Sequence, residues 1–189
     1  MMGGQVVVVW IGGVCGVGKT AVAKECSKQV GNSCFLDADD FHSVENKNKM
    51  KLGIPLSDSD RKPWLDELIR VIQQRAVDSQ REARQGYCIF CACSVLKLAY
   101  RQYLRNALRQ SVTKCIFILL TGSTQVLLHR LNSRQGHFMS PNLLSSQLEA
   151  LELLSEEEKA LGDEELDTSD QTISQLVSSI IQKIGLVES

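Results

Sequence analysis

Apolar runs alternate with amphipathic stretches along most of the chain. Runs rich in β-branched, aromatic and cysteine residues predict strands, and they are QVVVVWI (5–11), SCFLDAD (33–39), YCIFCAC (87–93) and KCIFILL (114–120). Apolar residues at helical spacing predict helices over residues 19–30, 63–84, 97–109, 124–134, 141–154 and 172–185. Continuous apolar strands that alternate with helices are typical of a parallel sheet covered on both faces. We therefore expect an α/β fold.

Two stretches lack a clear apolar period. Residues 40–60 predict a polar loop followed by a helix, and SEEEKALGDEELDTSD (155–170) is dominated by carboxylates. Charge runs are usually solvated, so we expect residues 155–170 to form a surface segment with little strand character. No repeat or linker interrupts the pattern, which favours a single domain over residues 1–189.

The bulk composition narrows the class of partner. The chain has 189 residues, of which 43% are hydrophobic and 23% charged, values that are ordinary for a globular domain. A net charge of −1 provides no broad positive field, so we expect no nucleic-acid and no membrane partner, and a small molecule instead. The N-terminal stretch lacks the basic flank and cleavage site of a signal peptide, and its apolar run is shorter than a membrane span. The expected location is cytoplasmic.

The seven cysteines lie mostly within apolar segments, which predicts buried thiols in a reducing compartment. Cys88 and Cys91 have the spacing of a metal or redox pair. A structural role is favoured because neither a second pair nor a histidine lies near them in the sequence.

A phosphate-binding loop follows the first strand. Residues 13–20 fit G-x-x-x-x-G-K-[ST], and they are Gly13, Val14, Cys15, Gly16, Val17, Gly18, Lys19 and Thr20. Such a loop turns backbone N–H groups toward a phosphate chain, and glycine leaves room for that approach. Lys19 would reach the β- and γ-phosphates, and the Thr20 hydroxyl would ligate Mg²⁺. Cys15 fits because its position contributes backbone. The loop alone does not specify the reaction, since motors, switches, transporters and kinases all use it.

Carboxylates follow the second strand, in LDADDFH (36–42). The carboxyl ends of parallel strands form the ligand crevice, so Asp37, Asp39, Asp40 and His42 would project near the γ-phosphate. A carboxylate there could accept the proton of an attacking hydroxyl or hold Mg²⁺ through water. The alternative is a polar turn without chemistry, and which carboxylate would be the base stays open.

Three further segments resemble successive signatures of the gluconokinase family, the small P-loop type related to shikimate and nucleoside monophosphate kinases. They are DADDFHSVENKNKMKLGIPLSDSDRKPWL (37–65), CSVLKLAYRQYLR (93–105) and RLNSRQGHFMSPNLLSSQLEALE (130–152). With the phosphate loop, the resemblance covers roughly residues 6–152. It implies a three-layer P-loop NTPase fold, a substrate-binding insertion at about residues 40–62 and a mobile lid at about 130–142.

The resemblance also implies a reaction. Members of the family transfer the γ-phosphate of ATP to the 6-hydroxyl of D-gluconate, giving 6-phospho-D-gluconate for pentose phosphate metabolism. ATP and Mg²⁺ are the implied cofactors. A homodimer is common among relatives, although no segment here predicts its surface.

The acceptor site requires cations for an acid and mixed polar groups for hydroxyls. We assign Arg61 and Lys97 to the carboxylate, His42 and Ser94 to polar contacts, and Asp39 to the reacting hydroxyl. The alternative for the two cations is ordinary surface charge. Trp64 is interpreted as a packing anchor rather than a ligand contact.

The expected lid supplies positive charge and excludes water. Arg130 and Arg134 are four residues apart on one predicted helix face, and Gly136 allows a bend. We assign Arg134 to catalytic contact with phosphate, Arg130 to nucleotide binding and His137 to the substrate. The alternative is that these side chains are merely solvated.

The chain departs from the family pattern at several positions. Ser43 and Leu153 stand where proline is usual, and Val95 stands where alanine is usual, so a bulkier side chain lies beside the expected pocket. Relatives have a hydrophobic fifth strand with adenine contacts nearby, whereas GDEELDTSD offers only Leu166. We therefore expect a solvated segment there.

Two other functions stay open. One is a kinase for another small acceptor, such as shikimate or a nucleotide, although an aromatic content of 5% does little to supply a base pocket. The other is a nucleotide-binding protein without useful catalysis, against which the intact Lys19, Thr20 and Asp39 argue.

Overall fold

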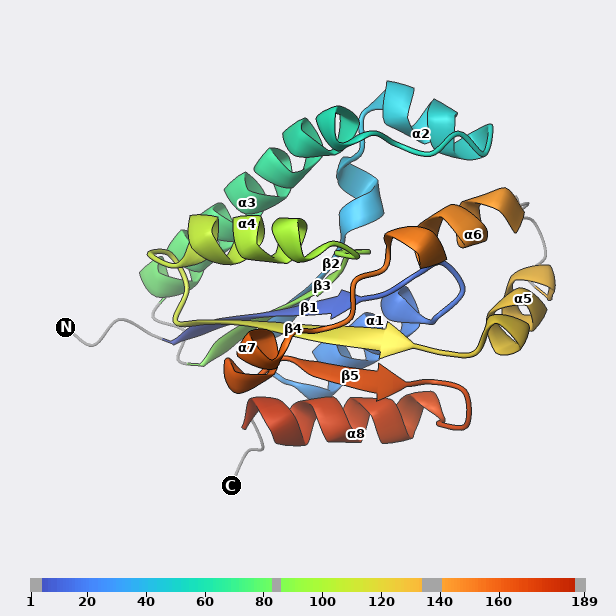
Figure 1. The fold of residues 1–189 in the computed structure, drawn as a ribbon. Coiled ribbons are helices and arrows are strands. Elements are labelled where there is room, and N and C mark those ends of the chain that lie inside the picture. The colour runs from blue at the N-terminus through green and yellow to red at the C-terminus, as the bar shows by residue number, and fades with distance from the viewer. Residues whose placement is uncertain (1–4, 83–85, 134–140, 186–189) are drawn as a thin grey trace.

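Five parallel strands form one sheet in the order β2-β3-β1-β4-β5 (Figure 1). This computed structural model describes residues 5–82, 86–133 and 141–185. The strands are β1 (Val6–Gly12), β2 (Ser33–Asp37), β3 (Tyr87–Ala92), β4 (Lys114–Thr121) and β5 (Glu164–Asp167). All four strand segments expected from the apolar runs are present, and the predicted α/β fold class is confirmed.

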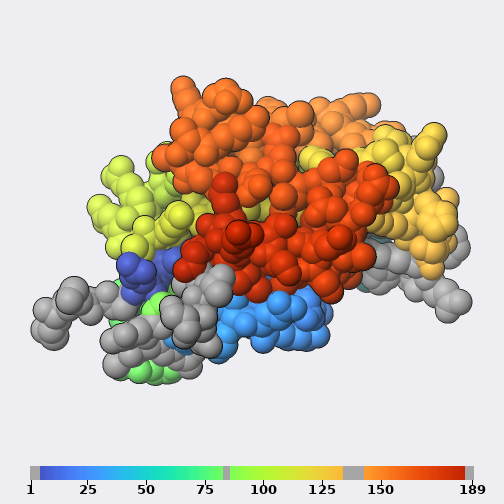
Figure 2. Space-filling view, turned by 90° about the horizontal axis from the view of Figure 1, so that it is seen from below, coloured from blue at the N-terminus to red at the C-terminus, as the bar shows by residue number. Residues whose placement is uncertain are grey.

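Helices cover both faces of the sheet. They are α1 (Lys19–Gln29), α2 (Val44–Lys51), α3 (Asp58–Arg81), α4 (Leu98–Leu108), α5 (Thr124–Asn132), α6 (Pro141–Ala150), α7 (Glu156–Ala160) and α8 (Ile173–Ile184). In Figure 1, α3 and α4 lie above the sheet, while α1 and α8 lie below it. The view from below in Figure 2 shows the red C-terminal segment beside the blue α1. Each face thus has its own apolar core, and alternate residues of β1 enter one core or the other.

Two helix boundaries differ from the sequence expectation. The helix expected from residue 63 begins at Asp58, because Ser57 and Asp60 form a capping box in which each side chain bonds the other residue's backbone N–H. The helix expected to reach residue 154 ends at Ala150. The earlier start of α3 brings Asp58 and Arg61 to the edge of the sheet where the phosphate loop lies.

The acidic stretch is not a solvated segment, and that prediction was wrong. Residues of β5 pair with β4, with Leu166 opposite Leu120. Two of its carboxylates, those of Glu158 and Asp163, are buried and ion-paired with arginines of α4. The counter-charges lie far away in the sequence, so the local charge pattern could not show that these groups would be buried.

The cysteine prediction agrees with the structure. Cys88 and Cys91 lie in β3 and are fully buried, and burial raises the pKa of both thiols above the usual range. No cluster of three or more His, Cys, Asp or Glu side chains suited to a metal occurs within the described ranges. No helix among the described residues is both long and apolar enough to span a membrane.

Candidate active site

The phosphate loop connects β1 to α1 and depends on glycine for its shape. Gly13, Gly16 and Gly18 have φ angles of +122°, +81° and +107°, a region that L side chains rarely adopt. A Cβ at Gly13 would also lie 2.3 Å from the carbonyl oxygen of Leu120. Gly13 therefore excludes a side chain on steric as well as conformational grounds.

The N-terminus of α1 is suited to an anion. Gly18 is its N-cap and supplies no side-chain hydrogen bond, so the first-turn N–H groups keep their capacity for a ligand at the positive end of the helix dipole. Lys19 is the first residue of this helix, and its Nζ donates to the carbonyl oxygen of Val14 at 2.9 Å. Burial lowers the pKa of Lys19, and the nearby Asp39 carboxylate opposes that shift. These residues fit a phosphate chain.

Thr20 and two aspartates form a connected polar group beside the loop. The Thr20 hydroxyl donates to Asp37 Oδ2 at 3.0 Å, and Asp37 Oδ1 accepts the backbone N–H of Asp39 at 3.1 Å. A hydroxyl and a carboxylate are ligand types that Mg²⁺ takes together with phosphate oxygens and water. Thr20 and Asp37 therefore fit the magnesium position of a nucleotide complex.

Asp39 differs from Asp37 in its surroundings. Asp39 is exposed to the cavity, but the protein around it desolvates its carboxylate and raises its pKa, while Lys19 opposes the shift and Asp37 and Asp40 add to it. A carboxyl group whose pKa is moved toward neutrality is a better general base than an ordinary one. Asp39 thus combines a place beside the phosphate lysine with altered acidity.

One cavity of about 470 Å³ joins the phosphate loop to the acceptor side. It is bounded by the loop, the end of β2, the start of α3, the residues after β3 and the inner side of α6. The predicted site residues that line it are Cys15, Gly16, Gly18, Lys19, Thr20, Asp39, His42, Arg61, Ser94 and Lys97. The fold thus brings the expected donor and acceptor residues to one place.

His42 is held as a neutral ring in this cavity. It is only 7% exposed and stacks on Trp64 with ring centroids 4.2 Å apart. Burial lowers the pKa of His42 to about 4, and the charges of Lys47 and Arg61 act in the same direction. Its Nδ1 has no hydrogen-bond partner among the described residues. Trp64 donates from Nε1 to the carbonyl oxygen of Ala38 at 2.7 Å, which agrees with its expected packing role.

The two acceptor-side cations meet at one carboxylate. Lys97 Nζ lies 2.9 Å from Asp58 Oδ1 and 3.1 Å from Asp58 Oδ2, and Arg61 NH1 lies 3.7 Å from Asp58 Oδ1. The Tyr100 hydroxyl also donates to Asp58. Arg61 and Lys97 are therefore arranged around a carboxylate, as a carboxylate-binding site requires.

Of the residues assigned to the expected lid, the structure describes Arg130. Arg130 donates to the hydroxyl and carbonyl oxygens of Thr168 at 2.8 Å and 2.6 Å, and it does not line the cavity. Arg134 and His137 lie outside the described residues.

The side chains of Val14 and Val17 in the phosphate loop are buried in the core beneath it, so these positions can offer a ligand only backbone.

Comparisons with known proteins decide the family. The sequence model of the family described as shikimate kinase matches residues 15–185. A curated protein named "Probable gluconokinase" from Dictyostelium discoideum is 43% identical over 156 residues, which is 82% of this chain and 74% of that protein. The chain belongs to the gluconokinase family.

Solved structures agree with this membership. A sugar kinase from Janibacter sp. HTCC2649 is 34% identical with a TM-score of 0.77, covering 97% of this chain and 96% of that one. A gluconokinase from Sinorhizobium meliloti 1021 is 32% identical with a TM-score of 0.74, covering 97% and 92%. The predicted family, P-loop kinase fold and kinase class are confirmed. Membership in the gluconokinase family implies ATP, typically with Mg²⁺, and a small-molecule substrate.

Several residues that line the cavity were not assigned to the site from the sequence, and Asp58 and Gln147 are two of them. Asp58 was not assigned to the site, although Ser57 and Asp60 around it carry the readable S-x-x-D signal of a helix start. Gln147 of α6 accepts the backbone N–H of Cys15 through Oε1 at 2.6 Å, and no local pattern indicates that contact. Both residues become visible only when distant segments are brought together.

Proposed function

We propose that the protein transfers the γ-phosphoryl group of ATP to the 6-hydroxyl of D-gluconate. The observation that carries the proposal is the single cavity in which a phosphate loop faces two cations gathered around a carboxylate. A linear sugar acid matches that arrangement, with its carboxylate at Arg61 and Lys97 and its far end toward Lys19. The acid group fixes the orientation, and the loop receives the donor.

On the donor side, the chain supplies charge and orientation. The backbone of residues 13–18 and the first turn of α1 bind phosphate oxygens, while Lys19 adds a cation that is already desolvated. Thr20 and Asp37 would hold Mg²⁺, which when bound neutralises phosphate charge.

On the acceptor side, Asp39 receives the proton of the attacking hydroxyl. Its raised pKa and its place beside Lys19 support this role. His42, which lines the cavity and is kept neutral by burial, orients a substrate hydroxyl, and Ser94 adds a second polar contact. Lys97 and Arg61 exchange their present carboxylate partner, Asp58, for that of the substrate.

The remaining parts of the proposal follow from family membership. A lid at about residues 130–142 closes over the nucleotide, with Arg134 on phosphate and His137 on the substrate. We assign Arg130, which donates to Thr168 in this structure, to the nucleotide side of this lid. One domain over residues 1–189, an insertion at about 40–62, a cytoplasmic location and a homodimer belong to the same proposal.

A coupled assay of ADP release tests the proposal. With Mg-ATP, D-gluconate is expected to support turnover, whereas shikimate and nucleoside monophosphates are not. Asp39→Asn should lower kcat by about 10²- to 10⁴-fold, the usual range for a lost general base. The control is Asp66→Asn, at an exposed aspartate of α3 that does not line the cavity, and its kcat should stay near that of the unsubstituted protein. Turnover with shikimate or a nucleotide but not with gluconate would refute the proposal.

A further inference from the structure

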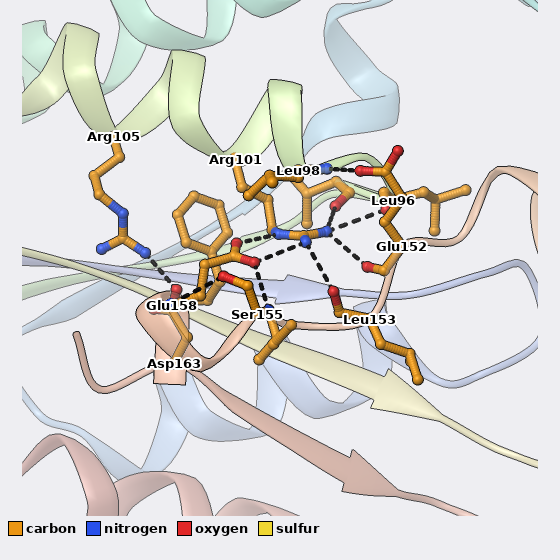
Figure 3. Close-up of polar contacts among 12 residues, drawn as sticks. Leu96, Leu98, Arg101, Arg105, Glu152, Leu153, Ser155, Glu158 and Asp163 are labelled. Carbon is orange, nitrogen blue, oxygen red and sulfur yellow. Dashed lines mark hydrogen bonds and ion pairs between the residues drawn. The ribbon is translucent and has the colours of Figure 1, made fainter. Parts of the chain in front are cut away.

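Arg101 of α4 is a buried arginine that binds two separate stretches of backbone. Its side chain is 1% exposed, and NH1 donates to the carbonyl oxygens of Val95 at 3.0 Å and Leu96 at 3.1 Å. The same nitrogen donates to the carbonyl oxygen of Glu152 at 3.1 Å (Figure 3). Arg101 therefore joins the loop that carries Ser94 and Lys97 to the segment that follows α6.

Glu158 balances the charge of this arginine. Arg101 Nε and NH2 lie 2.6 Å and 3.1 Å from the two carboxylate oxygens of Glu158, whose side chain is 7% exposed. The Glu158 carboxylate also accepts the backbone N–H of Ser155 in a capping box that begins α7. Hydrogen bonds from Arg101 and from Ser155 hold the Glu158 carboxylate in place. The planar guanidinium bound to it then directs NH1 toward the carbonyl oxygens of Val95, Leu96 and Glu152.

The loop held by Arg101 contains a residue in an unfavourable conformation. Val95 has a φ angle of +38°, and it is the one residue other than glycine with positive φ in the described part of the chain. A β-branched residue in this region is an outlier that persists only when its surroundings impose it. Val95 is also packed closely behind the phosphate loop, since a Cβ at Gly12 would lie 2.7 Å from Val95 Cγ2.

The same loop has backbone contacts with both halves of the cavity. Ser94 accepts the backbone N–H of Gly13 through its carbonyl oxygen at 3.0 Å, and Leu96 accepts that of Glu152 at 2.9 Å. Upstream of Glu152, Gln147 of α6 holds the backbone N–H of Cys15. The conformation of residues 94–97 is thereby linked to the phosphate loop and to α6.

We propose that Arg101, with Glu158, is a positioning residue that imposes the left-handed conformation of Val95 and so directs Ser94 and Lys97 into the acceptor cavity. The inference rests on the proposed function, because it assigns these residues to the acceptor. Arg101 does not touch the cavity itself. It acts through the backbone of residues 95 and 96.

The test is a rescue experiment with steady-state kinetics. Arg101→Lys keeps the charge opposite Glu158 but replaces the planar guanidinium with a single ammonium group, so the KM for D-gluconate should rise at least tenfold and by a larger factor than the KM for ATP. Adding Val95→Gly to Arg101→Lys should return the KM for gluconate to within threefold of the original value, because glycine adopts positive φ without strain. Val95→Ala is the matched control. It also removes both methyl groups but keeps Cβ, and it should not rescue.

Each outcome decides the inference. A drop in melting temperature with an unchanged KM for gluconate would show a merely structural role, and equal rescue by glycine and alanine would show relief of crowding instead. If Arg101→Lys does not fold, Glu158→Gln provides the comparison and should raise the same KM. Lack of turnover of gluconate by the unsubstituted protein refutes the proposed function instead, and the KM ratios are then measured with the acceptor that the ADP assay identifies.

Discussion

Asp58 is a carboxylate partner of both acceptor-side cations, Lys97 and Arg61. Its side chain is 65% exposed, and it bonds Lys97, Arg61 and Tyr100 at the rim of the cavity. Burial is slight, so the pairing is weakly stabilising and a substrate carboxylate can take the place of Asp58. The shared carboxylate offsets the repulsion between the two like charges.

Substitution of Asp58 tests this exchange. Asp58→Asn should lower the KM for D-gluconate by roughly two- to fivefold, because an exposed ion pair contributes up to about 1 kcal/mol. The matched control is Asp66→Asn, since Asp66 bonds Lys62 and Tyr103 in a similar arrangement that does not line the cavity. A higher KM in Asp58→Asn would mean that this carboxylate binds the substrate rather than competing with it.

His42 provides a pH-dependent property of the same cavity. Its pKa is about 4 in the folded protein and about 6.5 when unfolded, so between these values the unfolded state binds more protons. The contribution of His42 to stability is therefore complete above pH 6.5 and is lost as the pH falls toward 4.

Unfolding by urea at pH 7.5 and pH 5.0 measures this contribution. The free energy of unfolding of the unsubstituted protein should fall more between these pH values than that of His42→Gln. Desolvation raises the pKa values of Asp39 and Asp163, so these groups stabilise the folded protein as the pH falls and oppose the effect of His42. Because both proteins retain them, comparing the two proteins cancels this opposing effect. An NMR titration of His42 with a midpoint near 6.5 would contradict the account.

The acidic segment shows how burial depends on distant partners. Asp163 is 2% exposed, and its carboxylate pairs with Arg105 and accepts the backbone N–H of Phe117 at 2.9 Å. These contacts tie the start of β5 to β4 and α4. The segment that the charge pattern assigned to solvent thus completes the sheet.

Substitutions of Asp163 and Glu156 distinguish a buried, ion-paired acidic segment from a solvated one. Asp163→Ala should lower the free energy of unfolding by about 2–3 kcal/mol, because it removes hydrogen bonds to a charged group and leaves the Phe117 N–H unsatisfied. Glu156→Ala, at a carboxylate that is 90% exposed, should change it by less than about 0.5 kcal/mol. Similar effects in urea unfolding would favour the solvated segment instead.

Local sequence patterns predicted the strands and helices whose formation depends on residues close together in the sequence. Runs such as 5–11 and 114–120 gave β1 and β4 because a strand buried on both faces needs an unbroken apolar sequence. The capping signal of Ser57 and Asp60 is present in the sequence but was not used, and the helix was expected from Pro63, which lies within α3 rather than at its start. By contrast, β5 has one apolar residue, and its strand depends on pairing with β4 and on arginines more than fifty residues away.

The whole molecule assembles its cavity from segments that are far apart in the sequence. The phosphate loop could be predicted because its chemistry is contiguous, and Asp39, Arg61 and Lys97 could be assigned through motifs of the family. Contacts such as Cys15 with Gln147, 132 residues apart, depend on the packing of α6 and leave no local signal. The role that we propose for Arg101 also depends on contacts between distant segments, so no local pattern indicates it.

The identity of the phosphorylated product tests the central claim most directly. The protein is incubated with Mg-ATP and D-gluconate, and the product is examined by ³¹P and ¹³C NMR. We expect one phosphate monoester whose phosphorus couples to C6 of gluconate, since the proposed function has the acid end at Arg61 and Lys97 and the far end toward Lys19 and Asp39. Phosphate on another carbon, or no phosphorylated gluconate while shikimate or a nucleotide is phosphorylated, would contradict it.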